Sequence, residues 1–212
     1  MVNKIFNKDC LIGIKSLKSN SIKLIIADPP YNLNKNFGTY KEKENKNNWK
    51  ILTNKWLKEC YRVLATDGNI FVYGIHKHLC WVQCMMYETG FKYRRQIIWH
   101  YENGFAGYGK NSLNAEYEPL LWFSKTDKYI YHPIRVPYKS QERLKYKITK
   151  NKKVWKPNPE GRMEGDVWKF PTLAGRRFRD EKVNHPTQKP LSISRRIVKH
   201  FSNKNNTVLI PF

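Results

Sequence analysis

Two adjacent prolines mark the end of a short apolar run near the start of the chain. Residues 22–27 read Ile-Lys-Leu-Ile-Ile-Ala, and Asp28-Pro29-Pro30-Tyr31 follows directly. A run of this length, rich in β-branched residues, is typical of a buried strand. Proline ends such a strand because its nitrogen carries no hydrogen to donate to a neighbouring strand. The sequence therefore predicts a buried strand over 22–27 with a rigid turn at its carboxyl end.

Helix and strand patterns alternate along the chain after this turn. Between residues 49 and 64 the apolar side chains share one face of a helix, and Asp67-Gly68 follows as a stop signal. The predicted elements are helices over 49–64, about 77–88 and 191–201, and strands over 69–74, 91–99, 119–124 and 208–210. This alternation is typical of a sheet covered by helices on both faces. We therefore expect an α/β fold.

Positive charge dominates the chain and gathers in one segment. The sequence has 40 Lys and Arg residues against 17 Asp and Glu residues, a formal net charge of +23. Between positions 139 and 180, thirteen basic residues stand against five acidic ones, and aromatic residues such as Trp155 and Trp168 lie among them. Basic side chains neutralise phosphates and aromatic rings stack on bases, so this composition favours a nucleic-acid partner. We predict that residues 125–182 form a basic insert of this kind; a solvated loop region is the alternative.

Four basic side chains are candidates for contacts with nucleic acid. Arg176, Arg177 and Arg179 lie within the basic insert, and Lys110 ends a Gly-containing loop. That loop fits the spacing GxxxxGK, but Asn111 stands where a P-loop requires Ser or Thr to bind magnesium. We therefore expect Lys110 to approach a phosphate of the substrate and not to serve nucleotide hydrolysis.

The sequence carries no signal for membrane insertion, export or metal binding. Its longest apolar runs fall far short of the roughly 18 residues that a membrane span needs, and the N-terminus lacks the apolar segment of an export signal. We expect a cytoplasmic protein. Cys80 and Cys84 stand four residues apart in an apolar context, and the four cysteines form no Cys-x-x-Cys pair. We predict core thiols at these two positions and no metal site.

The residues at 28–31 combine three groups that suit one kind of ligand. The rigid turn holds three groups together: the acid of Asp28, a backbone carbonyl that proline frees from the strand ladder, and the aromatic ring of Tyr31. Two acceptors can take the two N–H donors of an amino group while the ring stacks on a planar base. The tetrapeptide therefore favours a nucleobase site; a strand-terminating turn with a solvent-facing Asp28 is the alternative.

Residues 28–31 resemble the catalytic motif of the amino-group DNA methyltransferases, which is typically Asp-Pro-Pro-Tyr in adenine-specific members. Two further segments carry the resemblance. Asp9-Cys10 is similar to the family's N-terminal Gly-Asp-Cys segment, with Lys8 in place of the Gly, and residues 185–190, His-Pro-Thr-Gln-Lys-Pro, match the segment ahead of the family's cofactor-binding strand. Their order along the chain resembles the permuted beta group, in which the basic recognition region lies between the two motifs.

The resemblance implies a fold, an activity and a division of the chain. The fold would be the Rossmann-like sheet of S-adenosylmethionine-dependent methyltransferases. The activity would be methylation of the adenine amino group in duplex DNA, usually within a restriction-modification system. The chain would divide into a catalytic α/β portion (1–124), a target-recognition insert (125–182) and the start of the cofactor-binding portion (183–212).

The resemblance also implies roles for single residues. The Asp28 carboxylate and the Pro29 carbonyl would accept hydrogen bonds from the amino group. Tyr31 would stack on the target base after the base rotates out of the duplex, and Pro30 completes the motif. The implied contacts with S-adenosylmethionine are Asp9 and Cys10 at its adenine, His185, Thr187, Gln188 and Lys189 near its methionine carboxylate, and Phe212.

The sequence departs from the family pattern at its last residues. The family continues with Asp-Pro-Phe-x-Gly-x-Gly, whereas this chain reads Ile210-Pro211-Phe212 and stops. We therefore expect a sheet that is incomplete at the C-terminus and weak binding of the cofactor. Three interpretations stay open: a truncated gene product, an expressed fragment, or one half of a protein that a second polypeptide or a homodimer partner completes. A cytosine amino-group methyltransferase and an inactive DNA-binding remnant are the alternatives, and Asp rather than Ser at position 28 favours adenine over cytosine.

Overall fold

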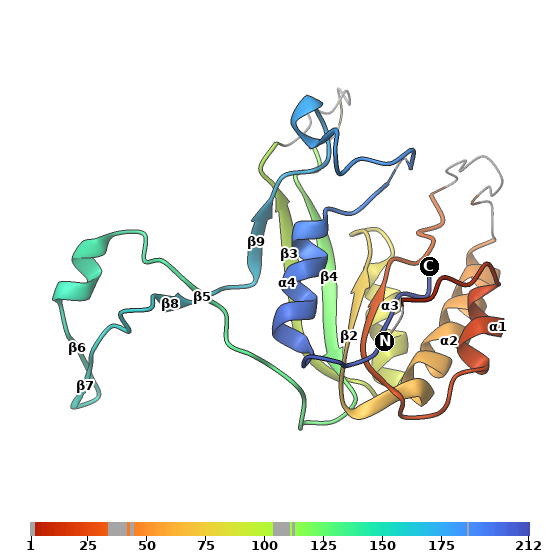
Figure 1. Cartoon of the computed structure of the whole chain (residues 1–212), viewed down its shortest axis with the longest axis horizontal. Helices are drawn as coiled ribbons and strands as arrows, with labels where there is room; N and C mark the ends of the chain where they lie inside the picture. Colours follow the sequence, from red (N-terminus) through yellow and green to blue (C-terminus); the bar gives the residue numbers. More distant parts are fainter. Residues whose placement is uncertain (1–2, 34–41, 43–44, 104–110, 112, 186) are drawn as a thin grey trace.

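The computed structural model describes residues 3–33, 42, 45–103, 111, 113–185 and 187–212 (Figure 1). Its helices are α1 (Cys10–Lys15), α2 (Lys46–Val63), α3 (Leu79–Thr89) and α4 (Leu191–Phe201), with 3-10 turns η1 (Gln141–Lys145) and η2 (Arg176–Phe178). Its strands are β1 (Ile22–Ala27), β2 (Leu64–Tyr73), β3 (Lys92–Tyr101), β4 (Tyr117–Ser124), β5 (Arg135–Val136), β6 (Ile148–Lys150), β7 (Lys153–Trp155), β8 (Arg162–Met163), β9 (Val167–Phe170) and β10 (Val208–Leu209). The helices and strands predicted from the sequence all form, within a few residues at each end, with one exception. β2 begins at Leu64, directly after α2, so Asp67-Gly68 lies inside the strand and is not a stop ahead of it.

A six-stranded sheet in the order β10-β1-β2-β4-β3-β9 forms the centre of the molecule. β4 is antiparallel to both of its neighbours, and every other pair in this sheet is parallel. The carboxyl ends of β1, β2 and β3 therefore meet at one edge. Because β4 runs the opposite way, its amino-terminal residues reach that same edge.

The direction of β4 differs from that of the other strands of the central sheet. A parallel neighbour requires a crossover of a dozen or more residues that usually contains a helix, and β2 reaches β3 through α3 in this way. β4 instead runs antiparallel beside β3 and lies between β3 and β2. The expected α/β sheet is confirmed, with one antiparallel strand that the helix and strand pattern did not reveal.

Helices cover both faces of the sheet, as the sequence predicts (Figure 1). On one face, α1, α2 and α3 bury an apolar cluster that includes Ile14, Trp56 and Met86. On the other face, Ile193, Ile197 and Phe201 of α4 pack in a second cluster. The sheet thus has a hydrophobic core on each side, and burial of apolar area supplies most of the stability of such a fold.

The cysteine prediction is wrong. Cys80 and Cys84 are exposed on α3, because the buried face of that helix carries Leu79, Val82, Met85 and Met86. Cys60 of α2 is the fully buried thiol. Among the residues that the structure describes, no group of three or more His, Cys, Asp or Glu side chains could hold a metal ion.

The segment 125–182 divides between an arm and the central sheet. Residues 135–163 extend away from the body and carry two small antiparallel pairs, β5 with β8 and β6 with β7 (Figure 1). β9 then returns to pair with β3 at the edge of the central sheet. Trp168 of β9 is only 3% exposed and belongs to the core, whereas Trp155 of β7 is 60% exposed. Of the two aromatic residues singled out above, only Trp155 is free to stack on a base.

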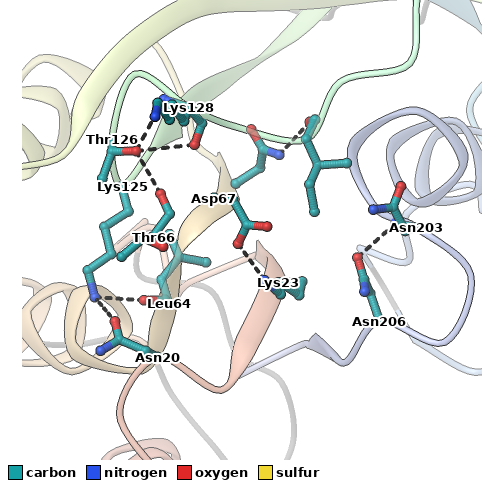
Figure 2. A network of polar contacts seen from close by, with 12 residues as sticks. Asn20, Lys23, Leu64, Thr66, Asp67, Lys125, Thr126, Lys128, Asn203 and Asn206 are labelled. Atoms are coloured by element: carbon teal, nitrogen blue, oxygen red, sulfur yellow. Dashed lines mark hydrogen bonds and ion pairs between the residues drawn. The ribbon is translucent and has the colours of Figure 1, made fainter.

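The end of the sheet opposite the β1 turn is closed by polar contacts (Figure 2). The Lys23 ammonium lies 2.5 Å from the Asp67 carboxylate. The Lys125 ammonium donates to the Leu64 carbonyl at 2.6 Å and to the Asn20 side chain. These contacts hold the connection before β1, the start of β2 and the end of β4 together.

No helix in the described part of the chain is long and apolar enough to cross a membrane.

The fully buried side chain of Asn69 links three segments of the chain near this end of the sheet. The Asn69 amide donates to the carbonyls of Ile130 and Phe201, at 2.8 and 3.2 Å. Its oxygen accepts from the Trp122 indole at 2.9 Å. One side chain therefore bonds to three groups, one each from β4, from the segment after β4 and from the end of α4.

We predict that Asn69→Leu destabilises the protein by about 2–4 kcal/mol, because the Trp122 N–H and two carbonyls lose their partners in a buried site. The midpoint of urea unfolding measures the loss. Asn114→Leu, at an exposed position, is the matched control and should leave the midpoint within about 0.5 kcal/mol of the wild type. Equal midpoints for the two variants would contradict the role of Asn69.

Candidate active site at the carboxyl edge of the sheet

Five elements bring polar side chains to the edge where β1 ends. Asp28 follows β1, Tyr73 ends β2, Tyr101 ends β3, Glu118 lies near the start of β4, and Lys189 precedes α4. We call these five residues, together with Tyr31, the edge cluster. In open α/β sheets ligands bind outside the carboxyl ends of the strands. The edge cluster therefore lies where a sheet of this kind binds its ligands.

Two carboxylates of the edge cluster share one ammonium. The Lys189 ammonium lies 2.9 Å from Glu118 Oε1 and 3.3 Å from Asp28 Oδ1. The Lys189 and Glu118 side chains are 13% and 12% exposed, and that of Asp28 is 30% exposed. With two acids and one base, the group has a formal charge of −1. Asp28, the most exposed of the three, is the one that a ligand can approach.

The Tyr31 hydroxyl lies between the same two carboxylates. It is 2.6 Å from Asp28 Oδ1 and 2.8 Å from Glu118 Oε1. Burial raises the pKa of Tyr31 well above its ordinary value, and the charges of Glu118 and Asp28 raise it further. The hydroxyl is therefore protonated, and its single hydrogen has two acceptors within reach.

Lys189 stays charged despite its burial. Burial by itself lowers the pKa of the Lys189 ammonium, but the Glu118 and Asp28 carboxylates outweigh that effect and hold the pKa above its ordinary value. Burial also raises the pKa of Tyr73 and Tyr101, and the nearby carboxylates act in the same direction. The cluster thus places hydroxyl and ammonium donors beside two carboxylate acceptors.

The turn at 28–31 is held by two side chains that the sequence analysis missed. The Trp49 indole donates to the Pro30 carbonyl at 2.9 Å. Glu42 is 3% exposed, and its two oxygens accept the backbone N–H groups of Tyr31 and Leu33, each at 2.9 Å. The turn is therefore fixed at both its carbonyl and its amide groups. A Glu in a polar stretch carries no local signal for this role.

The first two candidate cofactor contacts lie at the start of α1. The Asp9 carboxylate accepts the N–H groups of Leu11 and Ile12, at 2.9 and 3.2 Å, and so caps this helix. Cys10 is the first residue of α1 and half-buried. Burial raises the pKa of the Cys10 thiol. Asp9 thus has a structural role that is independent of any ligand.

Residues 185 and 187–189 lie ahead of α4. Gln188 accepts from the Val183 N–H at 2.7 Å and donates to the Glu181 carbonyl at 2.8 Å. His185 Nδ1 lies 3.4 Å from the Thr187 N–H. These bonds place Lys189 in the edge cluster.

The chain itself supplies carboxylates to Lys189 and to the start of α4. The family resemblance implies that Lys189 lies near the methionine carboxylate of the cofactor. In the structure Lys189 pairs with Glu118 and Asp28, and the Glu181 carboxylate accepts the Leu191 N–H at 2.6 Å.

Phe212 lies close to the turn. Its ring packs edge-on against Trp56 of α2, with 5.4 Å between centroids. Phe212 lines a small pocket with Pro30, Trp49, Trp56 and Glu42. The pocket places aromatic rings directly beside the turn that carries Asp28.

The candidate DNA contacts lie beyond the end of β3. Arg176, Arg177 and Arg179 are all exposed, on η2 and directly after it. Asn103, just after β3, accepts the Thr172 N–H at 2.6 Å and so ties this segment to the edge where the cluster lies. Lys110 lies outside the described residues.

Comparisons with known proteins place the chain in a family. A family model described as DNA methylase, for N6 and N4 methyltransferases, matches residues 22–212. The Type II methyltransferase M1.MboII of Moraxella bovis is 30% identical over 100% of this chain and 84% of its own length. The DNA adenine methyltransferase YhdJ of Escherichia coli (strain K12) is 33% identical over 98% of this chain and 70% of its own length. The chain spans 64% and 59% of two further relatives, M.HpaI of Haemophilus parainfluenzae and M.BglII of Bacillus subtilis.

Solved structures agree on the fold. The complex of M1.HpyAVI with SAM superposes with a TM-score of 0.59 at 22% identity, over 99% of this chain and 82% of that one. The cytosine-N4-specific PvuII DNA methyltransferase superposes with a TM-score of 0.67 at 13% identity, over 96% of this chain and 71% of that one. The expected methyltransferase fold is therefore confirmed. From residue 22 to residue 212 the chain belongs to the N6/N4 family of DNA methylases.

Proposed function

We propose that this protein transfers a methyl group from S-adenosylmethionine to the amino group of adenine in duplex DNA, as the modification enzyme of a restriction-modification system. The observation that carries the proposal is the turn at 28–31. Its acidic side chain stands at the carboxyl edge of a methyltransferase sheet and is the most exposed carboxylate of the edge cluster. Relatives such as the adenine methyltransferase YhdJ support adenine as the target, and so does Asp rather than Ser at position 28.

Asp28 and Pro29 supply acceptors for the target amino group. The lone pair of that nitrogen is delocalised into the ring, so the nitrogen is a poor nucleophile. Hydrogen bonds from its two N–H groups to the Asp28 carboxylate and the Pro29 carbonyl localise the lone pair on nitrogen. Asp28 also stabilises the positive charge that develops on the nitrogen as the new bond forms. Tyr31 stacks on the base once it has left the duplex.

Residues near the turn are proposed to hold the cofactor. Aromatic rings of Trp49, Trp56 and Phe212 line the small pocket beside Pro30. Asp9, Cys10, His185, Thr187, Gln188 and Lys189 are proposed to contribute further contacts. When bound, S-adenosylmethionine supplies an electrophilic methyl group on a sulfonium. The remaining acceleration comes from proximity and fixed orientation, because Trp49 and Glu42 hold the turn in place.

Several finer points stay predictions. These are the division into 1–124, 125–182 and 183–212, a cytoplasmic location, and a homodimer or completing polypeptide as partner. The arm at 135–163 supports the recognition role of the insert, because it projects from the body and exposes Trp155 and Tyr146, 60% and 63% exposed.

Asp28→Ala should lower methyl transfer by at least about a hundredfold, because a lost charge-stabilising acceptor in a transition state is worth roughly 3 kcal/mol or more. Tritium transfer from labelled cofactor to duplexes with and without adenine measures it, and analysis of the nucleosides separates methyladenine from methylcytosine. Asp67→Ala, at the opposite end of the sheet, is the control. Full turnover by Asp28→Ala would overturn the role of Asp28, and methylcytosine as the product would overturn the adenine target.

Arg176→Glu with Arg177→Glu should weaken DNA binding and flatten its salt dependence. Each phosphate neutralised contributes a slope of about −0.9 in log K against log salt, so losing two contacts makes the slope less negative by about 1.8. Fluorescence anisotropy of a labelled duplex at several salt concentrations measures the slope. Lys15→Glu with Lys18→Glu changes the charge equally at exposed positions around the end of α1. Equal slopes for the two double variants would place the DNA contact elsewhere.

A further inference from the structure

We propose that Glu118 is a positioning residue for methyl transfer: its carboxylate holds the Lys189 ammonium and offers the Tyr31 hydroxyl a second acceptor, so that Asp28 is released to bind the target amino group. This inference rests on the proposed function. It assigns a role to a residue that the sequence motifs did not single out.

The geometry places Glu118 as the main partner of Lys189. Its Oε1 lies 2.9 Å from the ammonium, against 3.3 Å for Asp28 Oδ1. Its Oε2 lies 3.4 Å from the Tyr101 hydroxyl. Glu118 is therefore engaged on both oxygens by groups from β3 and from the segment before α4. Its side chain is 12% exposed, less than half the value for Asp28.

Asp28 needs this partner because its own Oδ1 is occupied. Tyr31 and Lys189 both lie within bonding distance of that oxygen, at 2.6 and 3.3 Å. An ammonium and a hydroxyl that had only Asp28 as acceptor would compete with the incoming amino group. Their charge-assisted bonds would also withdraw electron density from the carboxylate. A second carboxylate in contact with the same two donors removes this competition.

The Tyr31 hydroxyl can change acceptors without moving its ring. Glu118 Oε1 is 2.8 Å from the hydroxyl oxygen, nearly as close as Asp28 Oδ1 at 2.6 Å. Rotation about the C–O bond turns the single hydrogen from one carboxylate to the other. The hydroxyl then leaves Asp28 Oδ1 free for the substrate, and the Tyr31 backbone stays fixed by Glu42.

Charge balance gives a test with paired variants. Glu118→Gln leaves an amide oxygen for Tyr31 but removes the charge that holds Lys189, so Lys189 and Asp28 become a one-to-one pair. We expect kcat to fall by about 30-fold or more, with the KM values for DNA and cofactor within about threefold. Adding Lys189→Met removes the surplus cation and should raise kcat at saturating cofactor at least about fivefold above Glu118→Gln alone. Glu88→Gln, exposed on α3, is the control and should match the wild type.

A second measurement needs neither cofactor nor DNA. Acylation of Lys189 by an amine-reactive ester, followed by mass spectrometry across a pH series, reports the titration of its ammonium. The two carboxylates hold the pKa of Lys189 above its ordinary value, so removal of Glu118 should shift the onset of acylation to lower pH. The same shift should not occur in Glu88→Gln.

The outcomes separate this inference from the proposed function. Unchanged acylation and unchanged kcat in Glu118→Gln would overturn the positioning role while leaving the methyltransferase intact. So would a loss of kcat that Lys189→Met does not relieve and that accompanies a lower thermal midpoint, because Glu118 would then be only structural. A wild-type protein that methylates neither adenine nor cytosine would overturn the proposed function, and the positioning role with it.

Discussion

The missing hydrogen on the proline nitrogen is the constraint on which the site depends. Pro29 and Pro30 cannot extend the β1 ladder, so the strand stops and leaves Asp28 at the carboxyl edge of the sheet. The turn is then fixed from outside the motif. The Trp49 indole donates a hydrogen bond to the Pro30 carbonyl, and the buried Glu42 carboxylate accepts hydrogen bonds from the N–H groups of Tyr31 and Leu33. The turn that carries the Asp28 carboxylate is thus held in place by groups from outside the motif.

The direction of one strand completes the site. β1, β2 and β3 bring their carboxyl ends to this edge, and the antiparallel β4 brings its amino-terminal end to the same place. A parallel strand in that position would carry Glu118 to the far end of the sheet, where Lys23 and Asp67 pair. The electrostatics of the edge cluster, with two carboxylates around one ammonium, therefore follow from topology. The same edge is tied through Asn103 and Thr172 to the basic segment at 176–179, so chemistry and DNA contact are proposed at one end of the molecule.

An ion pair and two cation–π contacts of Arg196 join the base of the arm to the body. Arg196 of α4 pairs with Glu164 and lies 4.5 Å from the ring of Phe170 and 5.7 Å from that of Trp168. Glu164 also donates its N–H to the Ile134 carbonyl at 2.9 Å. The two ends of the arm are therefore anchored side by side on the second core. Because the arm is anchored in this way, the segment 125–182 has a buried part that includes Trp168 and an exposed part that includes Trp155.

The sequence by itself determined the elements with a local cause: β1 and its proline turn, and the amphipathic α2 and α4. Proline chemistry and helical periodicity act within a few residues, so they can be read along the chain. Only the tertiary structure decided that Cys80 and Cys84 face outward, that Trp168 is buried, and that Glu42 and Glu118 contact Tyr31. Tyr31 and Glu118 are 87 positions apart, and no local pattern specifies a contact of that span. Such pairs form only when strand order and direction bring them together, because burial and pairing are properties of the assembled sheet.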